Sequence, residues 1–228
     1  VRVLRRHADR IGYRRDFTIC DREDQMRVLK TVYEQLHFTD KELPVRQTLG
    51  AISRAKSKDW GPEEYGQRSR DFQSEQIGLA YSAYQNFLKH SNATDFDDLI
   101  LLTVRLLKEN SEVRNRYGEH YRYLLIDEYQ DTNRPQYDLI KNLTQVHQNI
   151  TAVGDEDQSI YGFRGADIEN ILRFGTDFPG TTIVKLEQNY RSTQTILDAA
   201  SSVVSNNLNR KGKVLWTNEK AGQRIGLF

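Results

Sequence analysis

The sequence has little of several residue types, and each shortage excludes a class of protein. Its 228 residues include one Cys, one Met and four Pro. The single Cys20 cannot form a disulfide within the chain, and the five His are scattered without metal-site spacing. The longest apolar run, Leu99 to Leu102, is far shorter than the roughly 18–20 residues that cross a bilayer. We therefore expect a cytoplasmic protein without structural zinc, haem, secretion signal or membrane contact.

Apolar residues are also scarce for the length of the chain. Counted with Gly and without Tyr, they make up about 38% of the residues, whereas ~45–50% is usual. The chain starts at Val1 and its only Met is Met26, so it does not begin where translation begins. Both observations predict a fragment whose missing segments would supply further packing partners.

The first part of the chain has the apolar spacing of helices, and no strand is expected before about residue 92. A first helix is expected to end at Gly12, and Asp21 with Asp24 predicts the N-terminal cap of a second. Further helices are expected around residues 49–52 and 77–88. Thr94 with Asp97 predicts the start of another helix. This helix is expected to bury Phe96, Leu99, Ile100, Thr103, Leu106 and Leu107.

After residue 120 the pattern changes to strands that alternate with helices. Short apolar runs predict strands at residues 123–126, 150–153 and 182–186. Helices are expected between and after them, at residues 135–147, 167–174 and 192–206. Such alternation predicts a parallel sheet covered by helices on both faces. The expected fold class is therefore α/β, preceded by an all-helical subdomain.

An acid pair, Asp127 and Glu128, directly follows the first expected strand. Ligands of open parallel sheets bind beyond the carboxyl ends of the strands. There an Asp can hold Mg²⁺, usually through water, and a neighbouring Glu can accept a proton from an attacking water. Two solvated acids at the end of a strand are an equally good interpretation of this pair taken alone.

Three longer motifs end the expected strands: DEYQDTN at residues 127–133, GDEDQSIYGFRGAD at 154–167 and LEQNYRS at 186–192. In this order they resemble motifs II, III and IV of the superfamily 1 DNA helicases of the UvrD, PcrA and Rep group, and the PcrA members in particular. The resemblance covers the whole chain, including the helix start TDFDDL at 94–99. It implies a partial RecA-like parallel-sheet motor domain with an inserted all-helical subdomain, and ATP and Mg²⁺ as cofactors.

The resemblance also implies roles at the nucleotide. Asp127 would bind Mg²⁺ through water, and Glu128 would be the general base. Gln158 would sense the γ-phosphate, Arg191 would stabilise charge on it in the transition state, and Tyr190 would stack on the adenine. Without the motifs, Gln158 would be interpreted as a loop cap, and Tyr190 with Arg191 as packing plus a surface charge.

A second set of implied roles concerns DNA. Tyr161, Phe163 and Arg164 would lie along single-stranded DNA, where stacking of a base on an aromatic ring contributes ~1–3 kcal/mol. Close relatives often have Trp in place of Phe163, so a somewhat weaker grip is expected. An alternative places Phe163 in the core. Gln158 and Phe163 share one loop, so hydrolysis could be transmitted to the strand through it.

Basic residues of the helical part could meet the phosphates of duplex DNA at the single-strand/duplex junction. The candidates are Arg46, Arg54, Lys56 and Lys58. Ordinary solvated surface charges are the alternative interpretation.

The resemblance divides the chain into four segments. Residues 1–18 would end the first segment of motor domain 1A, 19–93 would form helical domain 1B, 94–187 would be the second segment of 1A, and 188–228 would start motor domain 2A. No Gly-Lys-Ser/Thr loop is present to cradle phosphates, so the chain is expected to need the remaining segments of its parent for ATP hydrolysis.

The parent is predicted to be a 3′-to-5′ DNA helicase that acts in repair or replication. Two alternatives stay open at this point. One is the motor region of a RecB- or AddA-like helicase-nuclease subunit, and the other is a non-catalytic DNA-binding relic.

Overall fold

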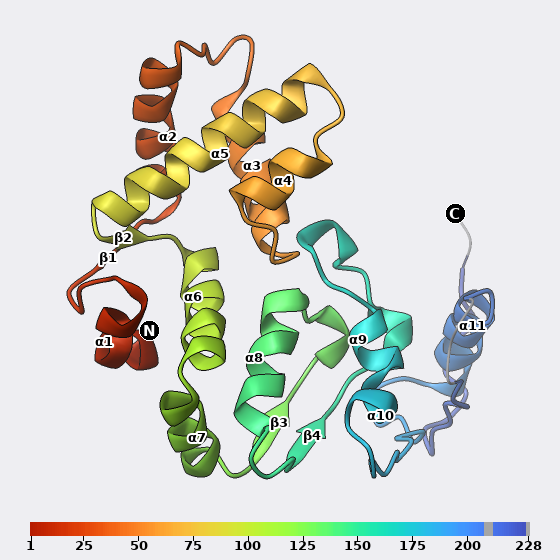
Figure 1. Cartoon of the computed structure of the whole chain (residues 1–228). Coiled ribbons are helices and arrows are strands. Elements are labelled where there is room, and N and C mark those ends of the chain that lie inside the picture. Colours follow the sequence, from red (N-terminus) through yellow and green to blue (C-terminus); the bar gives the residue numbers. More distant parts are fainter. Residues whose placement is uncertain (208–211, 227–228) are drawn as a thin grey trace.

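The computed structural model describes residues 1–207 and 212–226. Figure 1 shows a helical part at the top and a part with two parallel strands at the bottom. The helical part consists of α2 (Arg22–Leu36), α3 (Val45–Lys56), α4 (Pro62–Arg68) and α5 (Phe72–His90). Within the described residues, every helix is too short or too polar to span a lipid bilayer.

The N-terminal helices begin and end where the sequence predicts. Helix α1 (Arg2–His7) continues as the 3₁₀ helix η1 (Ala8–Ile11), which ends at Gly12 with a left-handed φ of 81°. Helix α2 begins at Asp21, whose carboxylate accepts the backbone N–H of Asp24 while the Asp24 carboxylate accepts that of Asp21. This reciprocal capping box satisfies amide groups that the first helical turn leaves unpaired.

The helical part has its own hydrophobic core. Its fully buried side chains include Leu29 and Val32 of α2, Ile52 of α3, and Tyr84 and Leu88 of α5. These positions lie on one face of each helix, as the apolar spacing predicts.

A short parallel strand pair joins the helical part to the rest of the molecule, contrary to the expectation that no strand precedes residue 92. Strand β1 (Thr18–Ile19) pairs with β2 (Ala93–Thr94), and the Cys20 N–H donates to the carbonyl oxygen of Thr94 at 2.8 Å. Strands of two residues are too short for an apolar alternation to reveal them. The pair fixes both crossings of the chain into the helical part side by side.

Helix α6 (Phe96–Glu109) begins one residue later than predicted. Its cap is Asp95, which exchanges capping-box hydrogen bonds with Asp98. The shift turns Phe96 outward, where it is 59% exposed, so its predicted burial was wrong. Thr103, Leu106 and Leu107 are buried as expected. Helix α7 (Ser111–His120) follows.

Two of the three predicted longer strands form a parallel pair. Strand β3 (Leu124–Ile126) pairs with β4 (Ile150–Ala152), and α8 (Arg134–Thr144) connects them. Further along the chain are α9 (Glu169–Leu172), α10 (Phe174–Asp177) and α11 (Gln194–Val204). In Figure 1 α8 lies beside β3, while α9 and α10 lie beyond β4. The apolar side chains of β3 and β4 pack with Ile140 of α8, Ile171 of α9 and Phe174 of α10.

The third predicted strand, 182–186, is not formed in the described part of the chain. It makes no ladder with β3 or β4, and Ile183, Val184 and Leu186 are 58%, 73% and 74% exposed. An apolar run favours extended backbone, but a strand also needs a neighbouring backbone to pair with. Nearby, an isolated bridge joins Gln188 to Trp216.

Candidate functional site

The candidate site lies at the carboxyl ends of β3 and β4. Backbone hydrogen bonds continue past both strands, from the Val153 N–H to the Ile126 carbonyl oxygen at 2.8 Å and from the Tyr129 N–H to the Val153 carbonyl oxygen at 2.9 Å. The loops that follow the two strands are therefore held edge to edge. We call residues 127–133 the acidic loop and residues 154–167 the sensor loop.

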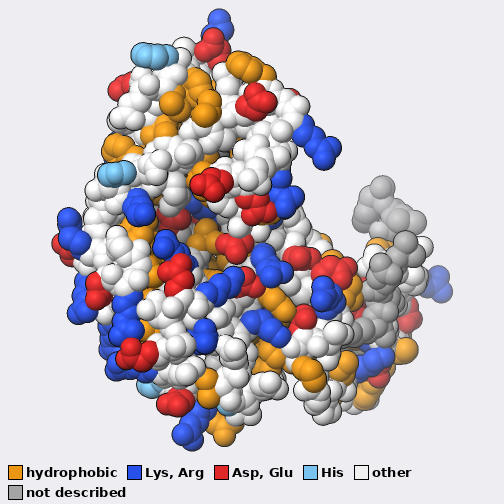
Figure 2. All heavy atoms as spheres, viewed as in Figure 1, with side chains coloured by type: hydrophobic (Ala, Val, Ile, Leu, Met, Phe, Trp, Pro, Cys, Tyr) orange, Lys and Arg blue, Asp and Glu red, His pale blue; other side chains and the backbone are white. Residues whose placement is uncertain are grey.

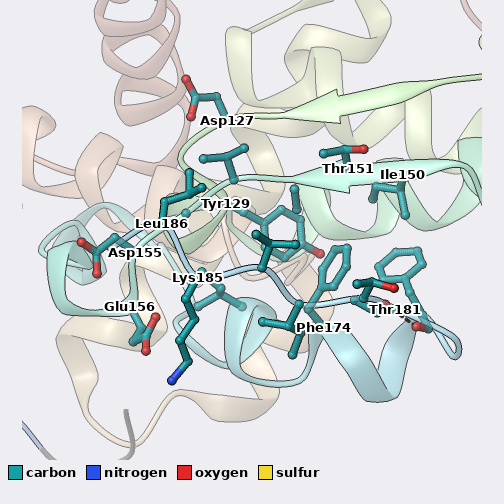
Figure 3. Close-up of a pocket in the computed structure, with 18 of the residues that line it drawn as sticks. Asp127, Tyr129, Ile150, Thr151, Asp155, Glu156, Phe174, Thr181, Lys185 and Leu186 are labelled. Atoms are coloured by element: carbon teal, nitrogen blue, oxygen red, sulfur yellow. Dashed lines mark hydrogen bonds between the residues drawn. The ribbon is translucent and has the colours of Figure 1, made fainter. Parts of the chain in front are cut away.

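A pocket of about 1260 Å³ opens beside these loops. Figure 3 shows Asp127 and Asp155 at the end where the strands finish, whereas Thr181 lies at the opposite end. Tyr129 and Phe174 form an apolar wall between the two ends. Three of the predicted nucleotide-site residues line the pocket together: Asp127, Glu128 and Gln158.

Glu128 adopts a backbone conformation that is uncommon for its residue type. Its φ of 50° is left-handed, which costs a non-Gly residue about 1–3 kcal/mol and occurs preferentially at functional sites. The Glu128 N–H donates to Asp127 Oδ1 at 2.9 Å. Glu128 Oε2 accepts a hydrogen bond from Gln130 Nε2 at 2.8 Å. The tight turn and this hydrogen bond together fix where the Glu128 carboxylate lies.

Gln130 is a site residue that the sequence reasoning missed. Its side chain is 1% exposed, and its amide oxygen accepts the Asp155 N–H at 3.0 Å. One amide thus contacts both loops. Only its place within the DEYQDTN motif could have drawn attention to it.

Gln158 lies in the 3₁₀ turn η3 (Glu156–Gln158) and contacts Asp155. Its amide nitrogen donates to Asp155 Oδ2 at 2.6 Å, and Lys213 forms an ion pair with Asp155 Oδ1. Burial raises the pKa of Asp155, but the hydrogen bonds from Lys213 and Gln158 outweigh it and leave this pKa below its usual value. In this structure the Gln158 amide therefore contacts a carboxylate that is held by Lys213 as well.

The three predicted DNA-contacting residues form one exposed cluster in and beside the 3₁₀ turn η4 (Gly162–Arg164). The rings of Tyr161 and Phe163 are 6.0 Å apart between centroids, and the Arg164 guanidinium lies 5.3 and 5.4 Å from the two centroids. Phe163 is 70% exposed, so the alternative that places it in the core is wrong. Two flat rings and a guanidinium on an open surface suit stacking of bases.

Both ends of the sensor loop are anchored to the acidic loop. At its start, the Asp155 N–H donates to Gln130, and at its end the Asp167 N–H donates to the Thr132 carbonyl oxygen at 3.0 Å. The buried Asn170 amide donates to the same carbonyl at 3.0 Å. The exposed cluster thus lies between two fixed points.

The sensor loop also passes close to the end of α3. Gly165 has a left-handed φ of 90°, and a Cβ on it would lie 2.2 Å from Ser57 Oγ. Only glycine fits this close approach. The sensor loop is therefore packed against the helical part at Gly165 as well as being anchored to the acidic loop at both ends.

Tyr190 and Arg191 are not brought to the pocket. Tyr190 is 80% exposed and donates its hydroxyl hydrogen to Gln188 Oε1 at 2.8 Å. The Arg191 side chain is exposed, and its backbone N–H donates to Asn189 Oδ1 at 2.9 Å. Neither residue lines the pocket. Their roles stay predictions.

Lys56 corrects one prediction about duplex DNA. Its side chain is 1% exposed, and its Nζ lies 2.7 Å from Asp95 Oδ2 and 2.8 Å from Asp98 Oδ1. A lysine buried between two carboxylates cannot meet DNA phosphates. Arg46, Arg54 and Lys58 are exposed, as a phosphate contact requires; Figure 2 shows how Lys and Arg are spread over one face of the molecule.

The acid pair suits Mg²⁺ only together with a nucleotide. No group of three or more potential metal ligands occurs among the residues that the structure describes. Mg²⁺ is typically held by one or two carboxylates, with water and substrate phosphates completing its shell. Asp127, exposed at a strand end beside Glu128, matches that arrangement.

Comparison with known proteins assigns both parts of the chain. The UvrD/REP helicase N-terminal domain model matches residues 1–179, and the UvrD-like helicase C-terminal domain model matches residues 184–228. The chain is 47% identical over its whole length to the ATP-dependent DNA helicase PcrA of Staphylococcus aureus strain Mu50, and 46% identical to that of Staphylococcus epidermidis strain RP62A. It spans 31% of the length of each.

Proposed function

This chain belongs to the UvrD/REP helicase family, and from this premise we propose that it is the central part of an ATP-dependent 3′-to-5′ DNA helicase. The parent protein would couple ATP hydrolysis to movement along single-stranded DNA and to duplex unwinding, in repair or replication. One observation carries the proposal. The sensor loop holds Gln158 at the pocket and Phe163 on an open surface, and both its ends are fixed to the loop that carries Glu128.

At the nucleotide end, Asp127 would hold Mg²⁺ through water, and Glu128 would accept the proton of the attacking water. Bound Mg²⁺ would neutralise phosphate charge. Gln158 would exchange its hydrogen bond with Asp155 for one with the γ-phosphate, which the amide can make because its NH₂ group is a donor. Tyr190 and Arg191 would join the site through movement of the segment that begins at residue 188.

At the DNA end, bases would stack on Tyr161 and Phe163, and Arg164 would contact the strand. Stacking tolerates any base, as a motor that moves along arbitrary sequence requires. Loss of the γ-phosphate would return Gln158 to Asp155 and shift the sensor loop between its two anchors. That shift is the proposed step by which hydrolysis moves DNA.

The proposed domain arrangement follows the sequence assignment. Residues 1–18 and 94–187 would belong to a RecA-like motor domain 1A, 19–93 to helical domain 1B, and 188–228 to motor domain 2A. The chain has no Gly-Lys-Ser/Thr loop, so we expect no ATP turnover without the other segments of the parent. End-to-end similarity to PcrA supports this function over a helicase-nuclease subunit.

The test uses the full-length protein that carries this chain. Glu128→Gln keeps the shape of the side chain and removes the proton acceptor, so we expect ATP and single-stranded DNA to bind while DNA-stimulated hydrolysis falls by ~10²–10⁴-fold. Glu119→Gln, at an exposed acid of α7, is the matched control and should behave as wild type. Unchanged turnover in Glu128→Gln would remove Glu128 from the role of base.

A further inference from the structure

A continuous line of hydrogen bonds joins the candidate base to the candidate phosphate sensor. Glu128 Oε2 accepts from Gln130 Nε2 at 2.8 Å, and Gln130 Oε1 accepts the Asp155 N–H at 3.0 Å. Asp155 Oδ2 in turn accepts from Gln158 Nε2 at 2.6 Å. Gln130 is the only member of the line that is buried.

The position demands the amide of Gln130 for a chemical reason. The side chain donates on one side, to a carboxylate, and accepts on the other, from a backbone N–H. Gln carries both groups, whereas an ionised Glu of the same length has only acceptors and a Met of similar bulk has no N–H or O–H donor. Burial makes each hydrogen bond costly to lose, because an unsatisfied buried group has no water to replace its partner. An ionised Glu or a Met at this position would therefore leave Glu128 without its donor.

The surrounding backbone leaves room for this amide. A Cβ on Gly154 would lie 2.7 Å from Gln130 Oε1 and 3.2 Å from the Tyr129 nitrogen. Ser159 Oγ also donates to the Gln130 carbonyl oxygen at 3.4 Å. The start of the sensor loop is thus shaped around Gln130, from its side chain to its backbone.

From this geometry we infer that Gln130 is a positioning residue for ATP hydrolysis. It holds the carboxylate of Glu128 toward the pocket and fixes the position of this carboxylate relative to the start of the sensor loop. A displacement of Gln158 would then move the Glu128 carboxylate through the hydrogen bonds of Asp155 and Gln130. The inference rests on the proposed function, because it assigns Gln130 a task only if Glu128 is the base.

The main variant is Gln130→Glu in the full-length protein. The new side chain can still accept the Asp155 N–H, but when it is ionised it cannot donate to Glu128 as the amide does. Two carboxylates at hydrogen-bond distance share one proton, so the pair keeps a proton at a pH where Glu128 of the wild type is free to accept one. We expect kcat at neutral pH to fall by about 10- to 100-fold, as is typical when an outer partner of a reacting group is lost. In a plot of kcat against pH, the acid limb should shift to higher pH by about one unit or more. Raising the pH should then restore part of the rate.

A second variant and a control complete the design. Gln130→Met keeps the bulk and removes both hydrogen bonds without adding charge, so it should lower kcat without moving the pH profile. Gln136→Glu is the matched control, since Gln136 accepts the Asn133 N–H in the capping box of α8, where Glu serves equally well. It should leave the rate and the profile unchanged. KM for ATP and the Kd for single-stranded oligonucleotide should stay at wild-type values in all three variants.

Each outcome decides for or against the inference. A shifted acid limb in Gln130→Glu alone, with KM retained, supports it. A wild-type profile in Gln130→Glu, or wild-type kcat in folded Gln130→Met, overturns it while the proposed function stands. If the Glu128→Gln protein keeps its DNA-stimulated turnover, the proposed function and the inference both fail. Thermal unfolding of each variant identifies any that do not fold, and wild-type kcat in the other Gln130 variant then still overturns the inference.

Discussion

Lys56 fixes the helical part to the rest of the protein through buried charge, and its removal gives a sharp prediction. Its ammonium group, at the end of α3, lies between Asp95 and Asp98 at the start of α6, and all three side chains are at most 4% exposed. The hydroxyl group of Tyr84, on α5, donates to Asp95 at 3.0 Å. Three helices therefore meet at one ion cluster.

Replacing Lys56 with Met should destabilise the protein by about 3–5 kcal/mol, because the carboxylates lose their counter-charge inside the protein. Burial raises the pKa of Asp98, and Lys56 opposes that rise. Without Lys56 the pKa rises further, and a carboxyl whose pKa is raised by folding lowers stability at pH values above its unfolded pKa. The difference in unfolding free energy between Lys56→Met and wild type should therefore become smaller as the pH falls toward the unfolded pKa of the carboxyl group.

Urea unfolding of the full-length protein, followed by circular dichroism, measures the effect. Lys58→Met is the control, since Lys58 is exposed and its Nζ lies 4.6 Å from the centroid of the Trp60 ring, a contact that contributes about 0.5–1 kcal/mol. Adding Asp98→Asn to Lys56→Met should recover part of the loss, because it removes one of the two stranded charges. A loss no larger than that of Lys58→Met, or no recovery in the double variant, would refute the reasoning.

Two further predictions concern the sensor loop. Phe163→Ala removes a ring that is 70% exposed. The binding free energy for single-stranded DNA, measured by fluorescence anisotropy, should weaken by the ~1–3 kcal/mol of one stacked base, while thermal stability stays unchanged. Gln158→Ala should impair unwinding more than DNA binding, because the amide contacts Asp155 and not the exposed cluster; equal losses in strand-displacement and anisotropy assays would contradict it.

The sequence predicted the parts of the site that local pattern determines. Strand ends, and the acids that follow them, are visible in an apolar run that stops at a charged residue, so Asp127 and Glu128 were placed correctly at the end of β3. The exposure of Phe163 was predicted through the family resemblance, since its immediate neighbours would equally suit a buried segment. Both cases depend on residues close together in the chain.

The burial of Gln130 and Lys56 was missed for a common physical reason. Each is a polar residue whose burial depends on hydrogen-bond partners far away in the sequence. The Asp155 N–H lies 25 residues from Gln130, and Asp95 and Asp98 lie 39 and 42 residues from Lys56. Periodicity and composition carry no information on such pairs. The segment 182–186 was predicted as a strand from its local apolar run and is not one. A strand also needs a neighbouring backbone to pair with, which the local sequence does not reveal.

In the sensor loop, such long-range contacts bear directly on the proposed function. If the ends of the loop were free, small changes in its backbone dihedral angles could accommodate a shift of Gln158, and Phe163 would not move. Here Asp155 is tied to Gln130, Asp167 is tied to Thr132, and Gly165 is packed on Ser57, so little slack is left between pocket and surface. Two of these anchors belong to the acidic loop and one to the helical part. In the proposed cycle, a movement of Gln158 would therefore displace the rings of Tyr161 and Phe163 relative to one or the other. The hydrogen bonds of Gln130 favour the acidic loop as the fixed frame.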